Sequence, residues 1–306
     1  MTIDVQTDSG IRTLTIPWLA FLKHMAVAGM GYKPRLYKLR RVFGMFFLYS
    51  DYLKRGDFDN NKFSTPSRFY DPTAKSHFSN LAGLAIADIL SKKINHAILT
   101  VNYETEMKLR GYKISGSRPD LISYAGSKTF ATESKGLSAS IIGDTKKKKI
   151  KEQSDKGPIP VNFSMASIAY NMYNKVECIY TDPPNDLNSK GNLLNLVSQE
   201  YYSGLQEFVE QINRDDVFQH SGGNFIRIPL IKFLLHDILD FPGGLTRLLM
   251  ISFLHRNSIN LLLPAEINSF AEKGLPENFE PFIFNWEQNE NVFIDNDMVG
   301  LELIPN

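Results

Sequence analysis

Two short motifs in the middle of the chain carry the residues best suited to chemistry. They are Pro119-Asp120 and Glu133-Ser134-Lys135, with twelve residues between Asp120 and Glu133. Positions i and i+2 of a strand point to the same face, so Glu133 and Lys135 project together if this segment is a strand. A tight hairpin between the motifs would bring Asp120 beside them. The sequence therefore predicts a site made of two carboxylates and one ammonium.

Such a site is suited to a divalent cation, because two neighbouring carboxylates repel one another unless a cation lies between them. Mg²⁺ takes oxygen ligands and is usually held by one or two carboxylates together with substrate phosphate. We expect Asp120 and Glu133 to bind Mg²⁺, or Mn²⁺ in its place, with the backbone carbonyl of Ser134 as a third ligand. The bound metal would lower the pKa of a water and stabilise charge on a phosphoryl oxygen, as phosphodiester hydrolysis requires. Lys135 would position that water, help to deprotonate it, or stabilise the phosphorane.

The segments around the motifs have the patterns of elements that could position them. An apolar stripe that begins at Phe78 predicts a helix ending near Lys93. β-favouring residues predict strands near 97–103 and 118–124 and, after the turn Ala125-Gly126-Ser127, a third strand KTFATESKG. The segment KKKKIKEQSDKG predicts a helix closed by glycine, and VNFSMASIAY and KVECIYT predict two more strands.

This order of a helix, a strand, Pro-Asp in a second strand, Glu-x-Lys in a third and then a polar helix resembles the PD-(D/E)xK nuclease superfamily over roughly residues 76–182. The resemblance implies an α/β fold with a restriction-endonuclease-like core, in which helices flank a central mixed sheet. It also implies that Asp120 and Glu133 bind Mg²⁺ and that Lys135 serves the attacking water.

Several members of that superfamily carry a further Gln and a further Glu. The Gln lies on the helix after the lysine motif, where Gln153 matches it and becomes a candidate catalytic residue. The Glu lies on the first helix, where this chain offers only Asn80 or Asp88 as substitutes. The number of metal ions is therefore left open.

Charge is distributed unevenly along the chain, although 34 Lys and Arg nearly balance 33 Asp and Glu. Residues 21–55 carry eight basic side chains and one acid, residues 105–156 carry twelve and six, and seven acids but no basic residue follow Lys273. Lysines beside the proposed catalytic strand would neutralise phosphates without reading bases. We expect this of Lys146, Lys147, Lys148, Lys149 and Lys151. The acidic tail would either bind a partner or cover the basic groove as a DNA mimic.

The chain of 306 residues is long enough for one large domain or two ordinary ones. We expect a basic helical segment over 1–70, the nuclease core over 71–185, and a mostly helical C-terminal region with the acidic tail over 186–306. The single cysteine, Cys178, excludes a disulfide framework within the chain and fits a cytoplasmic protein. Charged residues interrupt the most apolar stretches and the N-terminus lacks a signal-peptide pattern, so we expect neither a membrane span nor secretion.

Together these features predict an enzyme, a Mg²⁺-dependent endonuclease that acts on nucleic acid. DNA is the expected substrate, and prokaryotic restriction or anti-phage defence the expected setting, by analogy with the superfamily. The chain has no P-loop, so a separate helicase or ATPase is an expected partner, and a homodimer, as many relatives form, is another. Two alternatives stay open: a nucleic-acid-binding module with an inactive site on the same fold, and a non-catalytic interaction protein.

Overall fold

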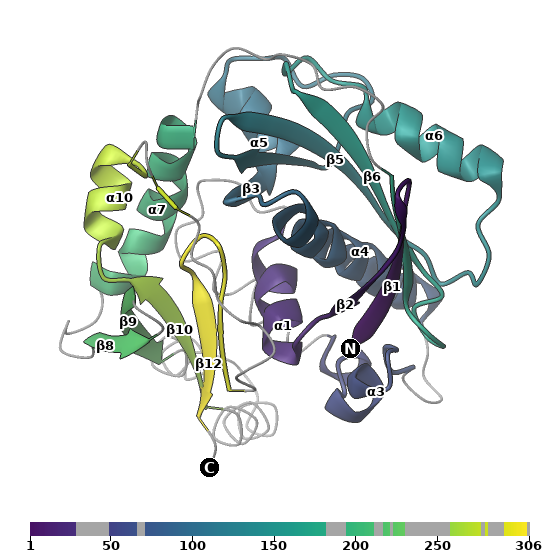
Figure 1. Ribbon diagram of the computed structural model, residues 1–306, viewed down its shortest axis with the longest axis horizontal. Coiled ribbons are helices and arrows are strands. Elements are labelled where there is room, and N and C mark those ends of the chain that lie inside the picture. The colour runs from purple at the N-terminus through teal and green to yellow at the C-terminus, as the bar shows by residue number, and fades with distance from the viewer. Residues whose placement is uncertain are drawn as a thin grey trace. The chain divides into compact units, whose positions relative to one another are not determined.

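The structure is a computed structural model that describes residues 1–28, 49–65, 71–181, 194–210, 217–220, 223–229, 258–276, 279–280 and 291–304. Internal contacts divide the chain into two compact units, Met1–Leu194 and Asn195–Asn306 (Figure 1). The division lies close to the expected boundary after residue 185, and both proposed motifs belong to the first unit. In the described part of the chain, no helix combines the length and the apolarity that crossing a bilayer demands.

The first unit is built on a seven-stranded sheet in the order β2-β1-β7-β6-β5-β4-β3. The strands are β1 Thr2–Thr7, β2 Gly10–Thr15, β3 Leu99–Asn102, β4 Leu121–Ala125, β5 Lys128–Gly136, β6 Phe163–Tyr170 and β7 Glu177–Thr181. β5 runs parallel to β6 and β1 runs parallel to β7, whereas the other neighbours are antiparallel. The expected α/β class with a central mixed sheet is confirmed.

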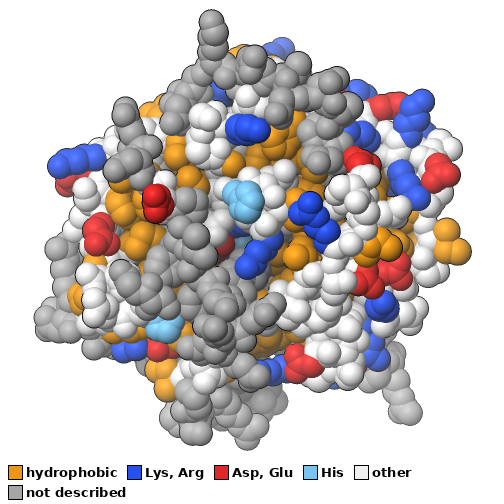
Figure 2. All heavy atoms as spheres, in the orientation of Figure 1, with side chains coloured by type: hydrophobic (Ala, Val, Ile, Leu, Met, Phe, Trp, Pro, Cys, Tyr) orange, Lys and Arg blue, Asp and Glu red, His pale blue; other side chains and the backbone are white. Residues whose placement is uncertain are grey.

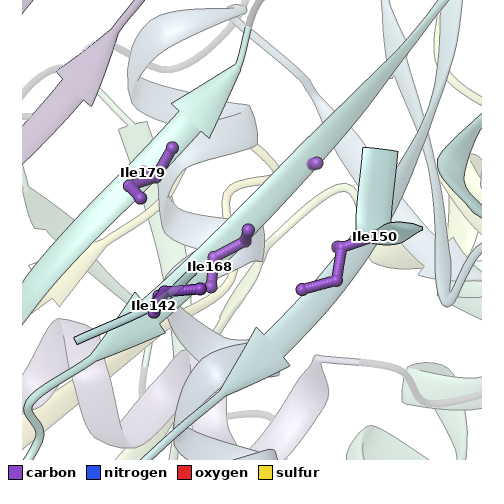
Figure 3. Packing of buried hydrophobic residues seen from close by; sticks show 5 residues of the cluster. Ile142, Ile150, Ile168 and Ile179 are labelled. Atoms are coloured by element: carbon purple, nitrogen blue, oxygen red, sulfur yellow. The ribbon is translucent and has the colours of Figure 1, made fainter. Parts of the chain in front are cut away.

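Two helices cover opposite faces of this sheet, α4 (Pro72–Ile94) and α6 (Asp144–Ser154) (Figure 1). α4 crosses β5 without space for a side chain: a Cβ atom at Gly136 would lie 1.7 Å from the carbonyl oxygen of Ser79. On the other face, Ile150 of α6 packs on Ala166, Ile168 and Ile179 (Figure 3). The strands that carry the motifs are thus held between two helical layers.

The ends of α4 follow from its sequence. Asp71 caps the helix by accepting a hydrogen bond of 2.8 Å from the N–H of Thr73, and Pro72 occupies the first helical turn, where its missing N–H costs nothing. The helix therefore begins before the apolar stripe that starts at Phe78. Its end at Ile94 agrees with the expected end near Lys93.

Residues 1–70 differ from the helical segment that the sequence predicts, because they begin with the β1–β2 hairpin. Ile3 and Val5 alternate with polar residues and are fully buried, as expected for a strand with one covered face. Helix α1 (Trp18–Val27), the 3₁₀ turn Ser50–Tyr52 and helix α3 (Arg55–Asp59) follow. Most of the basic stretch expected here lies in 29–48, outside the described residues.

The second unit was expected to be mostly helical, and this is wrong for its described residues. They form a five-stranded antiparallel sheet in the order β11-β12-β10-β9-β8. The strands are β8 Val217–His220, β9 Gly223–Pro229, β10 Ser258–Pro264, β11 Val292–Ile294 and β12 Gly300–Ile304, and the helices are α7 Leu194–Glu210 and α10 Ile267–Lys273. α7 agrees with the expectation of helix in this region, whereas the apolar run in β10 is a buried strand. Periodicity alone cannot distinguish such a strand from a buried helix.

Two described acids of the C-terminal tail, Asp297 and Glu302, bind groups within this second unit. Glu302 on β12 accepts two hydrogen bonds from Arg227, at 2.6 and 2.8 Å, and one of 2.7 Å from Asn260. Asp297 is buried and accepts a hydrogen bond of 2.8 Å from the hydroxyl of Tyr201. Glu302 thus links β12 to β9 and β10, and Asp297 binds α7, all within the second unit.

Candidate active site

The proposed site lies where β4 ends and β5 continues. β4 pairs with β5 from Leu121 opposite Thr132 to Ala125 opposite Lys128, around the two-residue turn Gly126-Ser127. Gly126 has a φ of +57°, which such a tight turn requires and glycine adopts readily. At the other end Pro119 has no N–H to donate to the ladder, so pairing stops. β5 goes on to Gly136, paired only with β6, and leaves one edge open.

Asp120 occupies this open edge directly before β4, one residue beyond the last paired position, Leu121 opposite Thr132. Its main chain is fixed on both sides: its N–H donates to Thr132 O at 3.2 Å, and its carbonyl accepts from the N–H of Tyr103 at 3.0 Å. Its Oδ2 accepts hydrogen bonds from the N–H of Ser134 at 3.0 Å and from the Ser134 hydroxyl at 2.9 Å. The carboxylate thereby satisfies a strand N–H that lacks a neighbouring strand.

Glu133 and Lys135 share the face of β5 that α6 covers, because they pair in register with Ala166 and Ile168, which pack against α6. The Lys135 ammonium donates to Oε1 of Glu133 and lies 3.9 Å from Oδ2 of Asp120. The Glu133 side chain is fully buried, whereas that of Asp120 is 39% exposed and that of Lys135 is 32% exposed. The sequence-based prediction that these three side chains meet is confirmed.

Glu133 is the carboxylate with the most perturbed proton affinity in this cluster. Burial raises its pKa to about 7, and the charge of Asp120 adds to that effect, while Lys135 and Gln153 act in the opposite direction. A buried carboxyl group with a neighbouring carboxylate favours its neutral form until a cation compensates the charge. The group is thus poised near neutral pH, as functional carboxylates often are.

The donor set at this edge fits a hard divalent cation. Oε2 of Glu133 is buried and has no hydrogen-bond partner among the described residues, which leaves an acceptor that a cation would satisfy. A residue's N–H and C=O project from the same edge of a strand, so the Ser134 carbonyl faces the edge where its N–H meets Asp120. No group of three His, Cys, Asp or Glu side chains comes together in the described ranges. Two carboxylates and a carbonyl suit Mg²⁺, which retains waters, better than Zn²⁺.

Gln153 lies at this site, as the sequence predicts. It is one of the groups that lower the pKa of Glu133, and its Nε2 donates to the carbonyl of Arg118 at 3.3 Å. Since Arg118 directly precedes Pro119-Asp120, this hydrogen bond ties α6 to the segment that carries the first carboxylate. The guanidinium of Arg118 itself donates to Gly116 O at 2.8 Å and pairs with Glu104.

The lysines of α6 divide into two groups. Lys146, Lys148 and Lys149 are exposed. Lys147 is 3.1 Å from Asp144, and Lys151 donates to the carbonyl of Ser164 on β6, so these two ammonium groups have partners within the unit. Basic and acidic side chains stand together on the surface at the upper right of Figure 2, where Figure 1 places α6.

Neither substitute for the superfamily's first-helix Glu joins the site in the described contacts. Asp88 is buried, and its Oδ2 is 2.7 Å from Nδ1 of His24 on α1. Burial alone would raise the pKa of Asp88, but Lys92, His24 and Lys23 outweigh it, so the pKa lies below its usual value. Asp88 therefore takes part in the packing of α1 on α4, and Asn80 is exposed.

Three contributions to the site were not anticipated from the sequence: Tyr103, the hydroxyl of Ser134 and the carbonyl of Arg118. Tyr103 holds the Asp120 main chain, and its hydroxyl accepts a hydrogen bond of 3.0 Å from the N–H of Ile159, beyond α6. It begins α5 (Tyr103–Leu109), a helix that the strand pattern at 97–103 did not reveal. The only signal in the sequence was that Ser134 and Arg118 are adjacent to the motif residues along the chain.

Comparison of the chain with protein-family models, with curated proteins and with solved structures found no match. The interpretation of the site therefore depends on the chemistry and geometry of its own residues.

Proposed function

We propose that the protein is a Mg²⁺-dependent nuclease of the restriction-endonuclease-like type, with its active site at the open edge of β5. One observation carries this proposal: Asp120, Glu133 and Lys135 meet at that edge, where Glu133 is buried and the Lys135 ammonium pairs with both carboxylates. An exposed structural role would not need a fully buried carboxylate whose pKa is raised by burial.

The order of elements supports the same proposal. α4, β3, β4, β5 and α6 occur in the order helix, strand, strand after Pro-Asp, strand with Glu-x-Lys and polar helix, with the short helix α5 between β3 and β4. Apart from α5, this is the order that the resemblance to the PD-(D/E)xK superfamily implies. Gln153 of α6 reaches the site, as in members that carry a Gln at this position.

Asp120, Glu133 and the Ser134 carbonyl would hold Mg²⁺, which when bound supplies an acidified water and compensates charge on the phosphate. The Lys135 ammonium pairs with both carboxylates and would hold the attacking water by donating a hydrogen bond from Nζ to the water oxygen. The water gives up one proton to solvent as its oxygen adds to phosphorus, the bond from phosphorus to the leaving sugar oxygen breaks, and that oxygen takes up a proton from solvent. Ser134 keeps the Asp120 carboxylate in place through its two hydrogen bonds.

A cleavage assay tests this proposal. Supercoiled plasmid, linear duplex, single-stranded DNA and RNA are incubated with Mg²⁺ or Mn²⁺ and the wild type, Lys135→Ala, Glu133→Ala, or the control Lys128→Ala. Lys128 is an exposed lysine at the start of the same strand. We expect Lys135→Ala and Glu133→Ala to lower the rate about 100-fold or more, and Lys128→Ala to leave it unchanged.

Two results would contradict the proposal: no cleavage of any substrate by the wild type, or equal cleavage by all four proteins. The substrate panel also decides between DNA and RNA, for which DNA is our proposal. A setting in prokaryotic defence and a helicase or ATPase partner belong to the same proposal and follow only if DNA is cut.

A further inference from the structure

One flank of α6 connects directly to the proposed active site. With about 100° of rotation per residue, Lys149 and Lys146 lie within about 40° of Gln153 around the helix axis. They are about one and two turns before Gln153, at about 6 and 10 Å along the axis. Gln153 contacts the carbonyl of Arg118 beside Asp120. The three side chains therefore form a row that leads away from the carboxylates.

This flank carries more net positive charge than the opposite flank. Lys146 and Lys149 are both exposed, and α6 has no acid within about 90° of Gln153 around its axis; Glu152, three residues after Lys149, lies about 100° from Gln153. The opposite flank contains Asp144, 3.1 Å from Lys147, and is followed by Asp155, 3.8 Å from Lys151. Lys148 lies on that side, about 140° from Gln153, and Glu152 follows it by one turn.

We propose that the flank Lys146–Lys149–Gln153 binds the sugar-phosphate backbone of the strand that is cut, and that Lys148 has no such role. The inference rests on the proposed nuclease function and names the surface that holds its substrate. Ammonium groups on a helix neutralise phosphates but carry no information about bases, so the contact is independent of sequence and sensitive to salt. Phosphates that leave the Asp120–Glu133 edge toward α6 would meet Lys149 first and Lys146 next.

A pair of charge reversals tests this inference: Lys149→Glu and Lys148→Glu in the full-length protein. The two lysines are adjacent in the sequence, both are exposed, and each reversal changes the net charge equally. Binding to a fluorescent 30-base-pair duplex is measured by anisotropy without divalent metal, so that nothing is cut, at several salt concentrations. We expect Lys149→Glu to weaken binding about tenfold and to lower the salt dependence by about one phosphate contact. Lys148→Glu should change the affinity by less than about twofold, since it leaves that flank intact.

Equal losses in both variants would overturn the proposal, because they would show a diffuse charge effect, and so would an absence of loss in both. If Lys149→Glu instead impairs binding only to vesicles that contain about one third phosphatidylserine, the flank binds membranes and the proposal is wrong. Circular dichroism and thermal unfolding establish that both variants fold. If the two variants differ in binding but the wild type cuts no substrate, the proposed binding flank is supported and the proposed nuclease function is wrong.

Discussion

The carboxylate of Glu133 contacts the ammonium of Lys135, two residues further along β5, and does so from a fully buried position. The same ammonium is 3.9 Å from Asp120, so one cation serves two acids. The other oxygen of Glu133, Oε2, has no hydrogen-bond partner among the described residues. With both carboxylates ionised the cluster has one excess negative charge, which a divalent cation bound there would offset.

The raised pKa of Glu133 predicts how stability depends on pH. In the metal-free protein this pKa is about 7 when folded, against 4.5 as its ordinary value. The folded state holds the proton more tightly, so stability falls as pH rises through this window. Glu133→Gln has no group that titrates at this position. From about pH 5 to about pH 8, the free energy of unfolding of wild type should therefore fall by about 2–3 kcal/mol relative to that of Glu133→Gln.

Urea unfolding in the presence of a chelator measures this difference. The comparison with Glu133→Gln cancels the contributions of the other titrating groups. A constant difference between the two proteins across this pH range would mean that Glu133 titrates normally, and the interpretation of its burial would be wrong.

Divalent metal should stabilise the protein through Asp120 and Glu133. Because the ion binds only the folded site, Mg²⁺ or Mn²⁺ at about 100 times its Kd adds about 2.7 kcal/mol, seen as a higher Tm. Asp120→Asn should abolish the increase, and Asp144→Asn, at an exposed acid on α6, should retain it. Differential scanning calorimetry with and without metal gives the values. An increase that persists in Asp120→Asn would place the metal elsewhere.

The close approach of α4 to β5 predicts that Gly136 tolerates no side chain. A Cβ there would lie 1.7 Å from the backbone oxygen of Ser79, and neither backbone can yield without moving the strand that carries Lys135. We expect Gly136→Ala to cost about 3 kcal/mol or more of stability and to lower nuclease activity as well. Gly56→Ala, in α3 with nothing within 4 Å of the new Cβ, should instead be neutral or stabilising by up to about 1 kcal/mol. Chemical denaturation gives the free energy of unfolding of the two variants and of wild type. A Gly136→Ala protein as stable as wild type would contradict the close packing of α4 on β5.

Local patterns in the sequence were enough to predict the motif strands and their hairpin. The turn at Gly126-Ser127 needs a positive φ at glycine, and once it forms, the hairpin brings Asp120 beside Glu133 and Lys135. The placement of Gln153 on α6 follows from the helical period in the same way. These relationships join residues close in sequence, where turn chemistry and periodicity act directly.

Contacts between distant segments decided the rest. β1 pairs in parallel with β7, more than 170 residues away, and so converts an expected helical segment into part of the sheet. Because α1 packs on α4, Asp88 contacts His24, and because α6 packs on β6, Lys151 donates to the carbonyl of Ser164. The sequence had made Asp88 and Lys151 candidates for the site.

By itself, then, the sequence determined which residues meet at the open edge of β5, because strand period and turn geometry are local properties. Only the tertiary structure decided that Glu133 is buried while Asp120 and Lys135 reach solvent, and which lysines of α6 stay exposed. Burial and the pairing of charges depend on the layers that pack around a segment, and these layers come from parts of the chain that no local pattern connects.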